Sequence, residues 1–282
     1  MNTLRSEFIS AVSAKYTTEE CSVLWRRSLS HICSVEYSQT YFIDEANLNA
    51  EQKESLYDIA QRLSGGEPFE YITGFAEFCS LKFRVNNSVL IPRLETQEIV
   101  DLIEKNYDSK KSNEILDIGT GSGCIAISLA LKLPLSKVTA LDISAKALEV
   151  AQGNAELHKA DNVKFIQADI LNCDNFCDRR FNLIVSNPPY VRRSETPTMP
   201  ERVLDYEPHT ALFVDDSDPL IFYKRIAALA PQLLTPDGSV MVEANQWLCR
   251  ETASVFEKAG FETKIIKDLF SEERFIVAKR HF

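Results

Sequence analysis

The chain opens with apolar positions that recur every three or four residues, which is the spacing of one face of an α-helix. A first helix is expected around Leu4 and Phe8, and a second near Thr18, whose hydroxyl could cap it. A third helix has a clearer start, because Asn49 can cap it and Gln52 stands at the capping-box position. The first 64 or so residues therefore predict a small helical domain.

Between about 69 and 92 the pattern changes to short β-like runs. One run covers 78–85 and a second covers 89–91, and Asn86-Asn87 between them is a plausible hairpin turn. Pro92 ends the second run. We interpret this segment as a β-hairpin connector, and we find no repeats in the chain.

From about 113 onward, apolar runs with strand character alternate with helical patterns. The expected strands are 115–118, 138–141, 163–166, 181–185, 239–242, 263–267 and 274–279, and the expected helices are 122–132, 144–158, 217–232 and 248–259. Alternation of this kind predicts an α/β fold with a mostly parallel sheet and helices on both faces. The last two strands have no helix between them, which suggests an antiparallel pair at one edge.

Composition narrows the class of protein. Hydrophobic residues make up 45% of the 282 residues, charged residues make up 26%, and no apolar run approaches the roughly 18 residues that span a bilayer. Glu7 stands where a signal peptide would need its apolar core, so we expect a cytoplasmic protein with no membrane partner. Seven cysteines without a Cys-x-x-Cys pair make a metal site unexpected. The net charge of -10 argues against direct DNA binding, which normally uses a basic face.

A glycine-rich segment follows the first strand of the alternating region. Strand 115–118 runs into Gly119-Thr120-Gly121-Ser122-Gly123, which we call the glycine loop, and then into a helix. Glycine lets the backbone turn sharply and approach a bound ligand closely. The loop has the spacing G-x-G-x-G, whereas the dinucleotide fingerprint is G-x-G-x-x-G. We therefore expect it to bind a cofactor other than a dinucleotide.

Acids also follow the next two strands. Asp142 stands about 20 residues beyond the glycine loop, where an acid can accept both hydroxyls of an adenosine ribose. Asp169 could accept the adenine amine while Ile170 packs on the ring. The alternative is that these acids only cap the turns after their strands. Because the pattern favours a ribose-and-adenine site and needs no pyrophosphate, S-adenosylmethionine fits better than NAD.

The fourth strand, 181–186, runs into Asn187-Pro188-Pro189-Tyr190, which we call the Asn-Pro-Pro-Tyr turn. Two prolines stop the strand and hold one rigid backbone shape. The Asn187 amide oxygen and the Pro188 carbonyl would then be two fixed acceptors, matching the two donors of an NH2 group on a planar system. Tyr190 could lie flat against that group. The sequence predicts methyl transfer to an amide or amine nitrogen, although a plain strand-terminating turn is the alternative.

Several shorter motifs accompany the glycine loop and the Asn-Pro-Pro-Tyr turn. They are Gly66-Glu67-Pro68, Ile72-Thr73-Gly74, Leu90-Ile91-Pro92-Arg93, Tyr206-Glu207-Pro208 and Arg274-Phe275. With them, nearly the whole chain resembles the glutamine-specific protein methyltransferases that modify bacterial peptide chain release factors, also called HemK-like proteins. The Asn-Pro-Pro-Tyr turn alone is shared with DNA adenine and some RNA methyltransferases, whereas the Ile-Pro-Arg segment and the helical front domain are more specific.

The resemblance implies a Rossmann-like class I methyltransferase sheet with a small helical N-terminal domain and a β-hairpin connector. It implies a substrate-recognition domain at 1–75, the connector at 76–92 and an S-adenosylmethionine-dependent domain at 93–282. The acceptor would be the glutamine of the Gly-Gly-Gln loop of release factors. The residues that would bind the cofactor are Gly119, Thr120, Gly121, Ser122, Gly123, Asp142, Asp169, Ile170 and Asn187. Those that would hold the glutamine are Asn187, Pro188, Pro189 and Tyr190, with Asn187, Pro188 and Tyr190 catalytic.

Four positions depart from the family pattern, namely Leu94, Gln97, Pro219 and Asn245. The family usually has an acid at 97, so Gln97 is expected to remove a charge near the cofactor entrance. Two rival substrates stay open: a glutamine of a ribosomal protein, and an adenine amine in nucleic acid. The acidic net charge disfavours the adenine amine.

Overall fold

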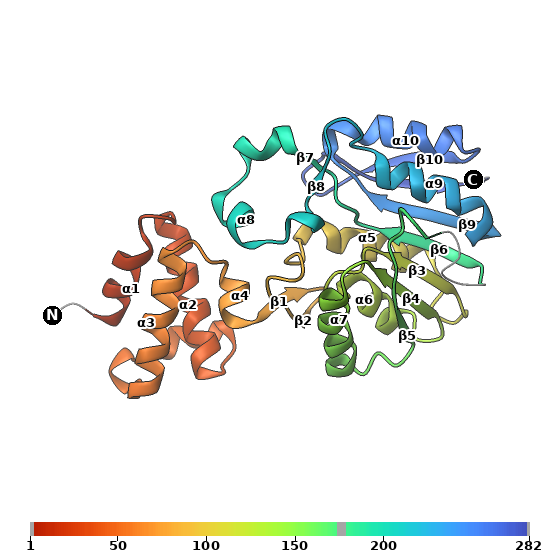
Figure 1. The fold of residues 1–282 in the computed structure, drawn as a ribbon. Helices are drawn as coiled ribbons and strands as arrows, with labels where there is room; N and C mark the ends of the chain where they lie inside the picture. The colour runs from red at the N-terminus through yellow and green to blue at the C-terminus, as the bar shows by residue number, and fades with distance from the viewer. Residues whose placement is uncertain (1–2, 174–178, 281–282) are drawn as a thin grey trace. The chain divides into compact units, whose positions relative to one another are not determined.

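The computed structural model describes residues 3–173 and 179–280, and its chain divides into two compact units (Figure 1). The first unit comprises the chain up to Gly74 together with Pro200–Tyr206, and the second comprises Phe75–Met199 and Glu207–Phe282. The β-hairpin that we expected as a connector thus belongs to the second unit. A short segment from late in the sequence also joins the first unit, which the sequence analysis did not anticipate.

The first unit is helical, as its apolar spacing predicts. Its elements are α1 Leu4–Val12, α2 Thr18–Cys33, η1 Tyr37–Phe42, η2 Glu45–Asn47, α3 Ala50–Ser64, α4 Phe69–Thr73 and α8 Glu201–Tyr206. The capping box of Asn49 and Gln52 at the start of α3 is confirmed. The expected cap of α2 is wrong by one residue, because Thr17 and Glu20 form the reciprocal capping box there.

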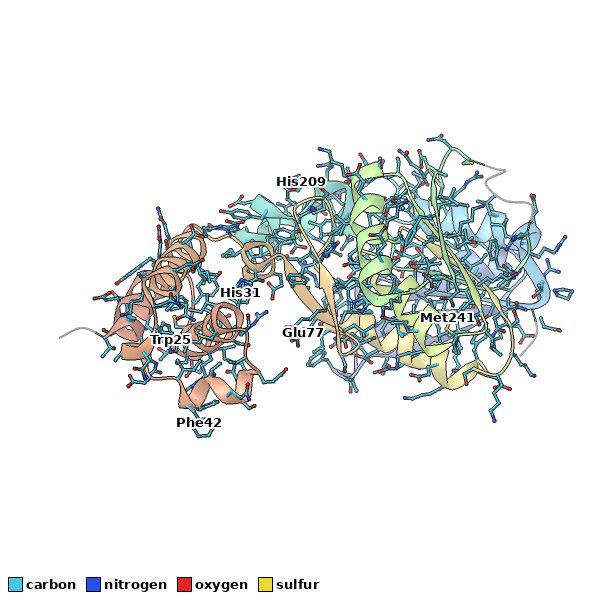
Figure 2. The ribbon with its side chains drawn as sticks, turned by 90° about the horizontal axis from the view of Figure 1, so that it is seen from below. Trp25, His31, Phe42, Glu77, His209 and Met241 are labelled. Carbon is cyan, nitrogen blue, oxygen red and sulfur yellow. The ribbon has the colours of Figure 1, made fainter. Side chains whose placement is uncertain are left out.

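Aromatic and aliphatic side chains from three helices form the core of this unit. The rings of Phe8 and Trp25 meet edge to face with centroids 5.4 Å apart, and Leu63 is fully buried beside them. Each such side chain contributes roughly 1.5–3 kcal/mol on burial. Figure 2 shows Trp25 among the helices, whereas Phe42 projects from the surface of the unit.

The second unit begins with a two-stranded hairpin, β1 Phe75–Phe78 and β2 Leu81–Arg84. The predicted turn at Asn86-Asn87 is wrong: the turn is formed by Cys79 and Ser80, whose φ angles are 49° and 61°. Positive φ at both central residues is typical of the type I′ turn, which usually contains Asn-Gly or Asp-Gly. Because the sequence lacks that signal here, packing places the turn. Phe78 and Phe83 are both buried, with ring centroids 6.0 Å apart.

Strands and helices alternate through the rest of the second unit. The main-sheet strands are β3 Glu114–Ile118, β4 Lys137–Asp142, β5 Val163–Gln167, β6 Phe181–Ser186, β9 Leu234–Glu243, β10 Glu262–Lys267 and β11 Glu273–Lys279, and the helices are α5 Leu94–Asn106, α6 Cys124–Lys132, α7 Ala145–His158, α9 Ile221–Leu233 and α10 Cys249–Lys258. The shorter elements are β7 Val191–Arg192, η3 Arg193–Thr198, η4 His209–Ala211, β8 Phe213–Val214 and η5 Gln246–Leu248. The sequence analysis did not identify α5 or the short elements between 191 and 214.

The main sheet has the strand order β10-β11-β9-β6-β3-β4-β5. The strands β5, β4, β3, β6 and β9 are parallel, and β11 is antiparallel to both of its neighbours. The α/β prediction and the antiparallel pair near one edge are therefore confirmed. The last strand of the chain does not take the outermost place, however, because it inserts between β9 and β10.

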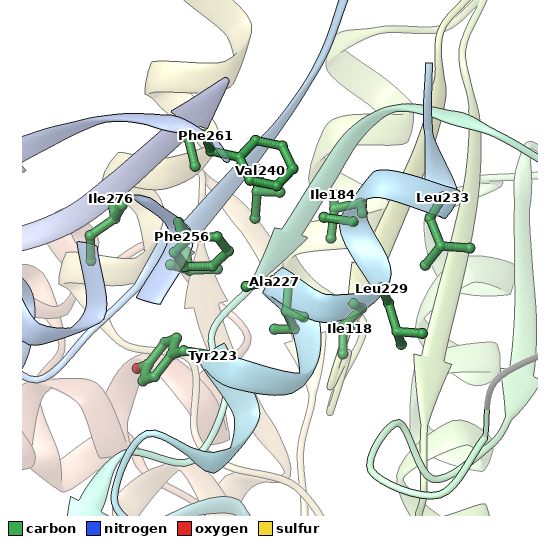
Figure 3. Packing of buried hydrophobic residues seen from close by; sticks show 14 of the residues in the cluster. Ile118, Ile184, Tyr223, Ala227, Leu229, Leu233, Val240, Phe256, Phe261 and Ile276 are labelled. Atoms are coloured by element: carbon green, nitrogen blue, oxygen red, sulfur yellow. The ribbon is translucent and has the colours of Figure 1, made fainter. Parts of the chain in front are cut away.

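Both faces of the sheet are covered by helices. One buried cluster joins α9 and α10 to the sheet, with Tyr223, Ile184 and Phe256 among its members (Figure 3). A second cluster joins α5 and α6 to the opposite face through residues such as Ile103 and Ile127. The central strands are thus buried on both sides, which explains why they are mostly apolar and do not alternate with polar residues. None of the helices built from the described residues combines the length and apolar character that a bilayer crossing requires.

Candidate active site

The predicted site residues follow strands that are neighbours in the sheet. The strand order reverses at β3, because β4 and β5 lie on one side of it and β6 and β9 lie on the other. Open α/β sheets bind ligands at such a point, in the crevice beyond the carboxyl ends of the strands. The glycine loop follows β3, Asp142 ends β4 and the Asn-Pro-Pro-Tyr turn follows β6. The fold therefore brings these three segments to one edge of the sheet.

The backbone of the glycine loop is fixed by the neighbouring strand. The N–H groups of Gly119 and Thr120 both donate to the carbonyl of Leu141, at 2.8 and 2.9 Å. Gly119 and Gly121 have φ angles of 75° and 55°, which L side chains rarely adopt. No atom of the described residues lies within 4 Å of a Cβ added at either glycine. Both positions therefore leave room for a ligand to approach the backbone.

The third glycine has a different role. A Cβ added at Gly123 would lie 2.9 Å from Ile127 Cδ1 and 3.1 Å from Ala151 Cβ. Gly123 also has a φ of 81° and starts α6. Its missing side chain therefore lets α6 and α7 pack closely against each other behind the loop.

The polar side chains of the loop turn inward. Thr120 Oγ1 donates to Asp117 Oδ2 at 2.6 Å, and both residues are buried. Asp117 Oδ1 and Ser122 Oγ are buried without hydrogen-bond partners among the residues that the structure describes. Burial raises the pKa of Asp117 to about 7. The backbone of the loop, together with one unsatisfied carboxylate oxygen behind it, is thus what this segment offers to a polar ligand.

Asp142 holds a fixed orientation at the end of β4. Its Oδ2 accepts the N–H of Gly121 at 2.8 Å, and its Oδ1 accepts the N–H of Ser144 at 2.9 Å. Burial raises the pKa of Asp142, although these backbone hydrogen bonds act to lower it. Each carboxylate oxygen has further acceptor capacity, so a positioned Asp142 can still accept two vicinal hydroxyls.

Asp169 and Ile170 lie beyond β5 at the same edge. Asp169 accepts the N–H of Leu171 at 2.9 Å and the side-chain amide of Asn172. The structure thus gives Asp169 the turn-capping role that was the alternative, and a contact with an adenine amine stays a prediction. Ile170 is 5% exposed and belongs to the cluster beneath α9.

The Asn-Pro-Pro-Tyr turn is held at both ends. Asn187 Nδ2 donates to Thr96 Oγ1 at 3.0 Å, and Tyr190 Oη donates to Glu243 Oε1 at 3.1 Å. Thr96 Oγ1 in turn donates to Glu243 Oε2 at 2.7 Å. Asn187 Oδ1 takes no hydrogen bond from any described residue. Glu243 therefore anchors the first residue of the turn through Thr96 and the last residue directly.

Glu243 is a buried acid among partners of mixed charge. It is 1% exposed, and burial raises its pKa, while hydrogen bonds from Thr96 and Tyr190 and the cation of Arg274 act in the opposite direction. Arg274 is itself held by the Asp268 carboxylate, with Nε and Oδ2 3.1 Å apart. Burial, together with the adjacent Glu243, raises the pKa of Tyr190, so its hydroxyl stays a donor.

Thr96 and Glu243 are the two residues of this hydrogen-bonded chain that the sequence analysis did not assign to the site. A signal for Glu243 was present, because it ends an apolar strand in the same way as Asp142 ends β4. Thr96 carried no such signal: it lies in the first turn of α5, a helix that the sequence analysis did not identify. Only the packing of α5 beside β6 and β9 reveals it.

Two of the shorter motifs meet through a buried carboxylate. Glu207 accepts the N–H of Ile91 at 3.1 Å and forms an ion pair with Arg93 at 2.6 Å. The segments at 90–93 and 206–208 are more than a hundred residues apart in sequence. Through Glu207 the two motifs together secure the chain just before α5.

Two of the departures from the family pattern also take structural roles. Gln97 Oε1 accepts the N–H of Cys79 at 2.8 Å and so ties the turn of the hairpin to α5. Asn245 Nδ2 donates to the Glu195 carboxylate at 3.1 and 3.2 Å and lies 3.4 Å from the Tyr190 carbonyl. Leu94 is exposed at the start of α5, and Pro219 precedes α9.

Comparison with known proteins agrees with this geometry. A family model described as a methyltransferase domain matches residues 109–274. The fold is similar to the crystal structure of a methyltransferase from Pyrococcus furiosus, with a TM-score of 0.52, 19% identity and coverage of 72% of this chain and 91% of that one.

Two relatives match over nearly their whole length. The release factor glutamine methyltransferase of Bacteroides thetaiotaomicron is 42% identical over 99% of this chain and 100% of its own. That of Flavobacterium psychrophilum is 40% identical over 96% of each chain. On this similarity, and with a site assembled at the edge of a methyltransferase sheet, the chain belongs to the release factor glutamine methyltransferase family.

Proposed function

We propose that this protein transfers a methyl group from S-adenosylmethionine to the side-chain amide nitrogen of the glutamine in the Gly-Gly-Gln loop of peptide chain release factors. The observation that carries the proposal is the Asn-Pro-Pro-Tyr turn, held by Thr96 and Glu243 beside the glycine loop. The names of the relatives support the choice of substrate.

The cofactor would be bound by the glycine loop, Asp142, Asp169, Ile170 and Asn187. Open space at Gly119 and Gly121, and the carboxylate of Asp142, suit an uncharged ribose better than a pyrophosphate. The unsatisfied oxygen of Asp117 adds a hydrogen-bond acceptor behind the loop, which suits a ligand with an amine donor. When bound, S-adenosylmethionine supplies a methyl group on a positively charged sulfur.

The acceptor nitrogen needs help from the protein, because an amide lone pair is delocalised into its carbonyl. Asn187 Oδ1 and the Pro188 carbonyl accept the two N–H groups of the substrate amide and place partial negative charge beside its nitrogen. That charge favours the positive charge that develops on nitrogen as it attacks. Correct positioning supplies much of the remaining acceleration, of order 7–11 kcal/mol for well-oriented groups. The new N–CH3 bond forms as the S–CH3 bond breaks, and the nitrogen then loses a proton.

The helical first unit would recognise the release factor. Tyr41 and Phe42 on η1 are 61% and 89% exposed, and solvent-exposed aromatic side chains of this size are typical of protein-binding surfaces. The Arg26 guanidinium stacks on the Tyr41 ring 3.4 Å from its centroid, which holds that ring in place.

The test is a transfer assay with labelled S-adenosylmethionine and four acceptors: a release factor, its Gly-Gly-Gln variant with Gln→Ala, ribosomal protein and DNA. Label on the release factor but not on its variant is the expected result. Label only on ribosomal protein or on DNA would overturn the choice of substrate.

A variant of the chain tests the acceptor site. Asn187→Ala should lower transfer by roughly 100- to 1,000-fold, which is the scale for removing one preorganised hydrogen-bonding group. The thermal melting temperature should change little, because Asn187 makes a single side-chain hydrogen bond at the edge of the sheet. Unchanged turnover in this variant would reject the assignment of Asn187.

A further inference from the structure

We propose that Thr96 and Glu243 are positioning residues that determine which atom of the Asn187 side-chain amide faces the acceptor. The inference rests on the proposed function, because it concerns the amide that would hold the glutamine. It is drawn from one chain of hydrogen bonds that joins three separate elements: the turn after β6, the first turn of α5 and the end of β9.

The direction of each hydrogen bond follows from the groups involved. An ionised Glu243 carboxylate can only accept, so Thr96 must use its single hydroxyl proton on it, over 2.7 Å. Thr96 can then only accept from Asn187, over 3.0 Å. The atom of Asn187 that faces Thr96 must therefore be the NH2 group, and the oxygen is left on the other side of the amide.

This orientation matters because the two amide orientations have opposite chemistry. With NH2 bound to Thr96, Asn187 presents an acceptor to the two N–H donors of a glutamine amide. With the amide turned over, donor would face donor, and no hydrogen bond could form. Oxygen and nitrogen are almost equal in size, so shape alone does not select between these orientations.

The same carboxylate also fixes the other end of the turn. Its Oε1 accepts from Tyr190 at 3.1 Å, so both oxygens of Glu243 are used on the acceptor site. The groups around it are Thr96 and Glu95 from α5, Tyr190, and Arg274 from β11; its backbone carbonyl accepts from Tyr223 of α9 at 3.0 Å. Burial raises the pKa of Glu243, whereas the hydrogen bonds from Thr96 and Tyr190 and the nearby Arg274 cation favour the ionised form, in which both carboxylate oxygens accept.

Thr96→Val tests the inference, because valine keeps the shape of threonine and removes the hydroxyl. We expect kcat/KM for the release factor to fall roughly 10- to 100-fold while the dissociation constant of S-adenosylmethionine stays within about 3-fold. Thr96→Ser restores a hydroxyl and should recover most of the activity. Thr252→Val is a matched control, since Thr252 is fully buried in α10 and its hydroxyl has no partner among the described residues.

The amide itself supplies a readout that needs no substrate. In a 1H–15N correlation spectrum of the full chain, the Asn187 NH2 signals, identified by their loss in Asn187→Asp, should move in Thr96→Val and return in Thr96→Ser. Unmoved signals in Thr96→Val would overturn the inference. Full activity of Thr96→Val, or equal loss of activity in Thr96→Ser, would overturn it as well. If the wild-type protein labels no release factor while the variants show the expected shifts, the proposed function is rejected. The roles of Thr96 and Glu243 in orienting the Asn187 amide are then still supported.

Discussion

Replacing Gly123 with alanine should destabilise the protein through two separate effects. The first is conformational: Gly123 has a φ of 81°, and a left-handed conformation costs a residue with a Cβ roughly 1–2 kcal/mol. The second is steric, because the new Cβ would lie 2.9 Å from Ile127 Cδ1 and 3.1 Å from Ala151 Cβ. Overpacking of a dense core typically costs about 1–3 kcal/mol.

The two effects together predict a loss of about 2–5 kcal/mol in the free energy of unfolding. Gly121→Ala is the matched control, because Gly121 also has a positive φ but no described atom lies within 4 Å of an added Cβ. It should lose only the conformational part, about 1–2 kcal/mol. Its added methyl group fills the space over the loop, so it should weaken S-adenosylmethionine binding more than it weakens the fold.

Urea unfolding followed by circular dichroism measures the stability of both variants, and calorimetric titration measures the affinity for the cofactor. Ile127→Val removes the Cδ1 atom that makes the shortest contact, so it should recover part of the stability lost in Gly123→Ala. Equal destabilisation by the two alanine variants would refute the reasoning, because it would mean that the contacts of the new Cβ with Ile127 and Ala151 contribute nothing. If Ile127→Val recovers no stability, the steric cost would be assigned to the contact of the new Cβ with Ala151.

Three further predictions concern buried carboxylates. Asp142→Ala should weaken S-adenosylmethionine binding roughly 10- to 100-fold by calorimetry through the loss of hydrogen bonds to a charged group, and an unaltered dissociation constant would reject its ribose role. The pKa of Asp117 is raised from its ordinary 3.8 to about 7, so the folded protein binds this proton more tightly than the unfolded chain does. Protonation of Asp117 therefore stabilises the fold, and this contribution to stability is lost as pH rises through about 7. Asp117→Asn should therefore reduce the fall in unfolding free energy between pH 4 and pH 8 by up to about 4 kcal/mol, and an unchanged pH profile in urea unfolding would contradict this. Glu207→Gln should cost about 1.5–3 kcal/mol of stability by weakening the bonds to Arg93 and Ile91, and a wild-type urea midpoint would contradict it.

Much of the second unit could be predicted from local patterns. The strands 115–118 and 181–185 are mostly apolar because both faces of the sheet are covered, and Ser144 caps the helix that follows β4 as expected. The glycine loop and the Asn-Pro-Pro-Tyr turn were identifiable because unusual backbone shapes require particular residues, glycine at positive φ and proline at a strand end.

What the sequence did not reveal depends on contacts between distant segments. The hairpin turn at Cys79-Ser80 has no turn signature of its own and is placed by the burial of two phenylalanines. The insertion of β11 between β9 and β10 is a choice among sheet positions that any apolar strand could fill.

The orientation of the Asn187 amide shows most clearly what the sequence determines and what only the tertiary structure determines. The sequence by itself indicated that Asn187 directly follows a strand and that the glycine loop follows another, because strand, glycine and proline signals are local. Only the tertiary structure decided which atom of its amide is free, because that depends on Thr96 and Glu243, 91 residues before it and 56 residues after it. A hydrogen bond has a direction, and its direction is settled by the partner that packing brings within reach.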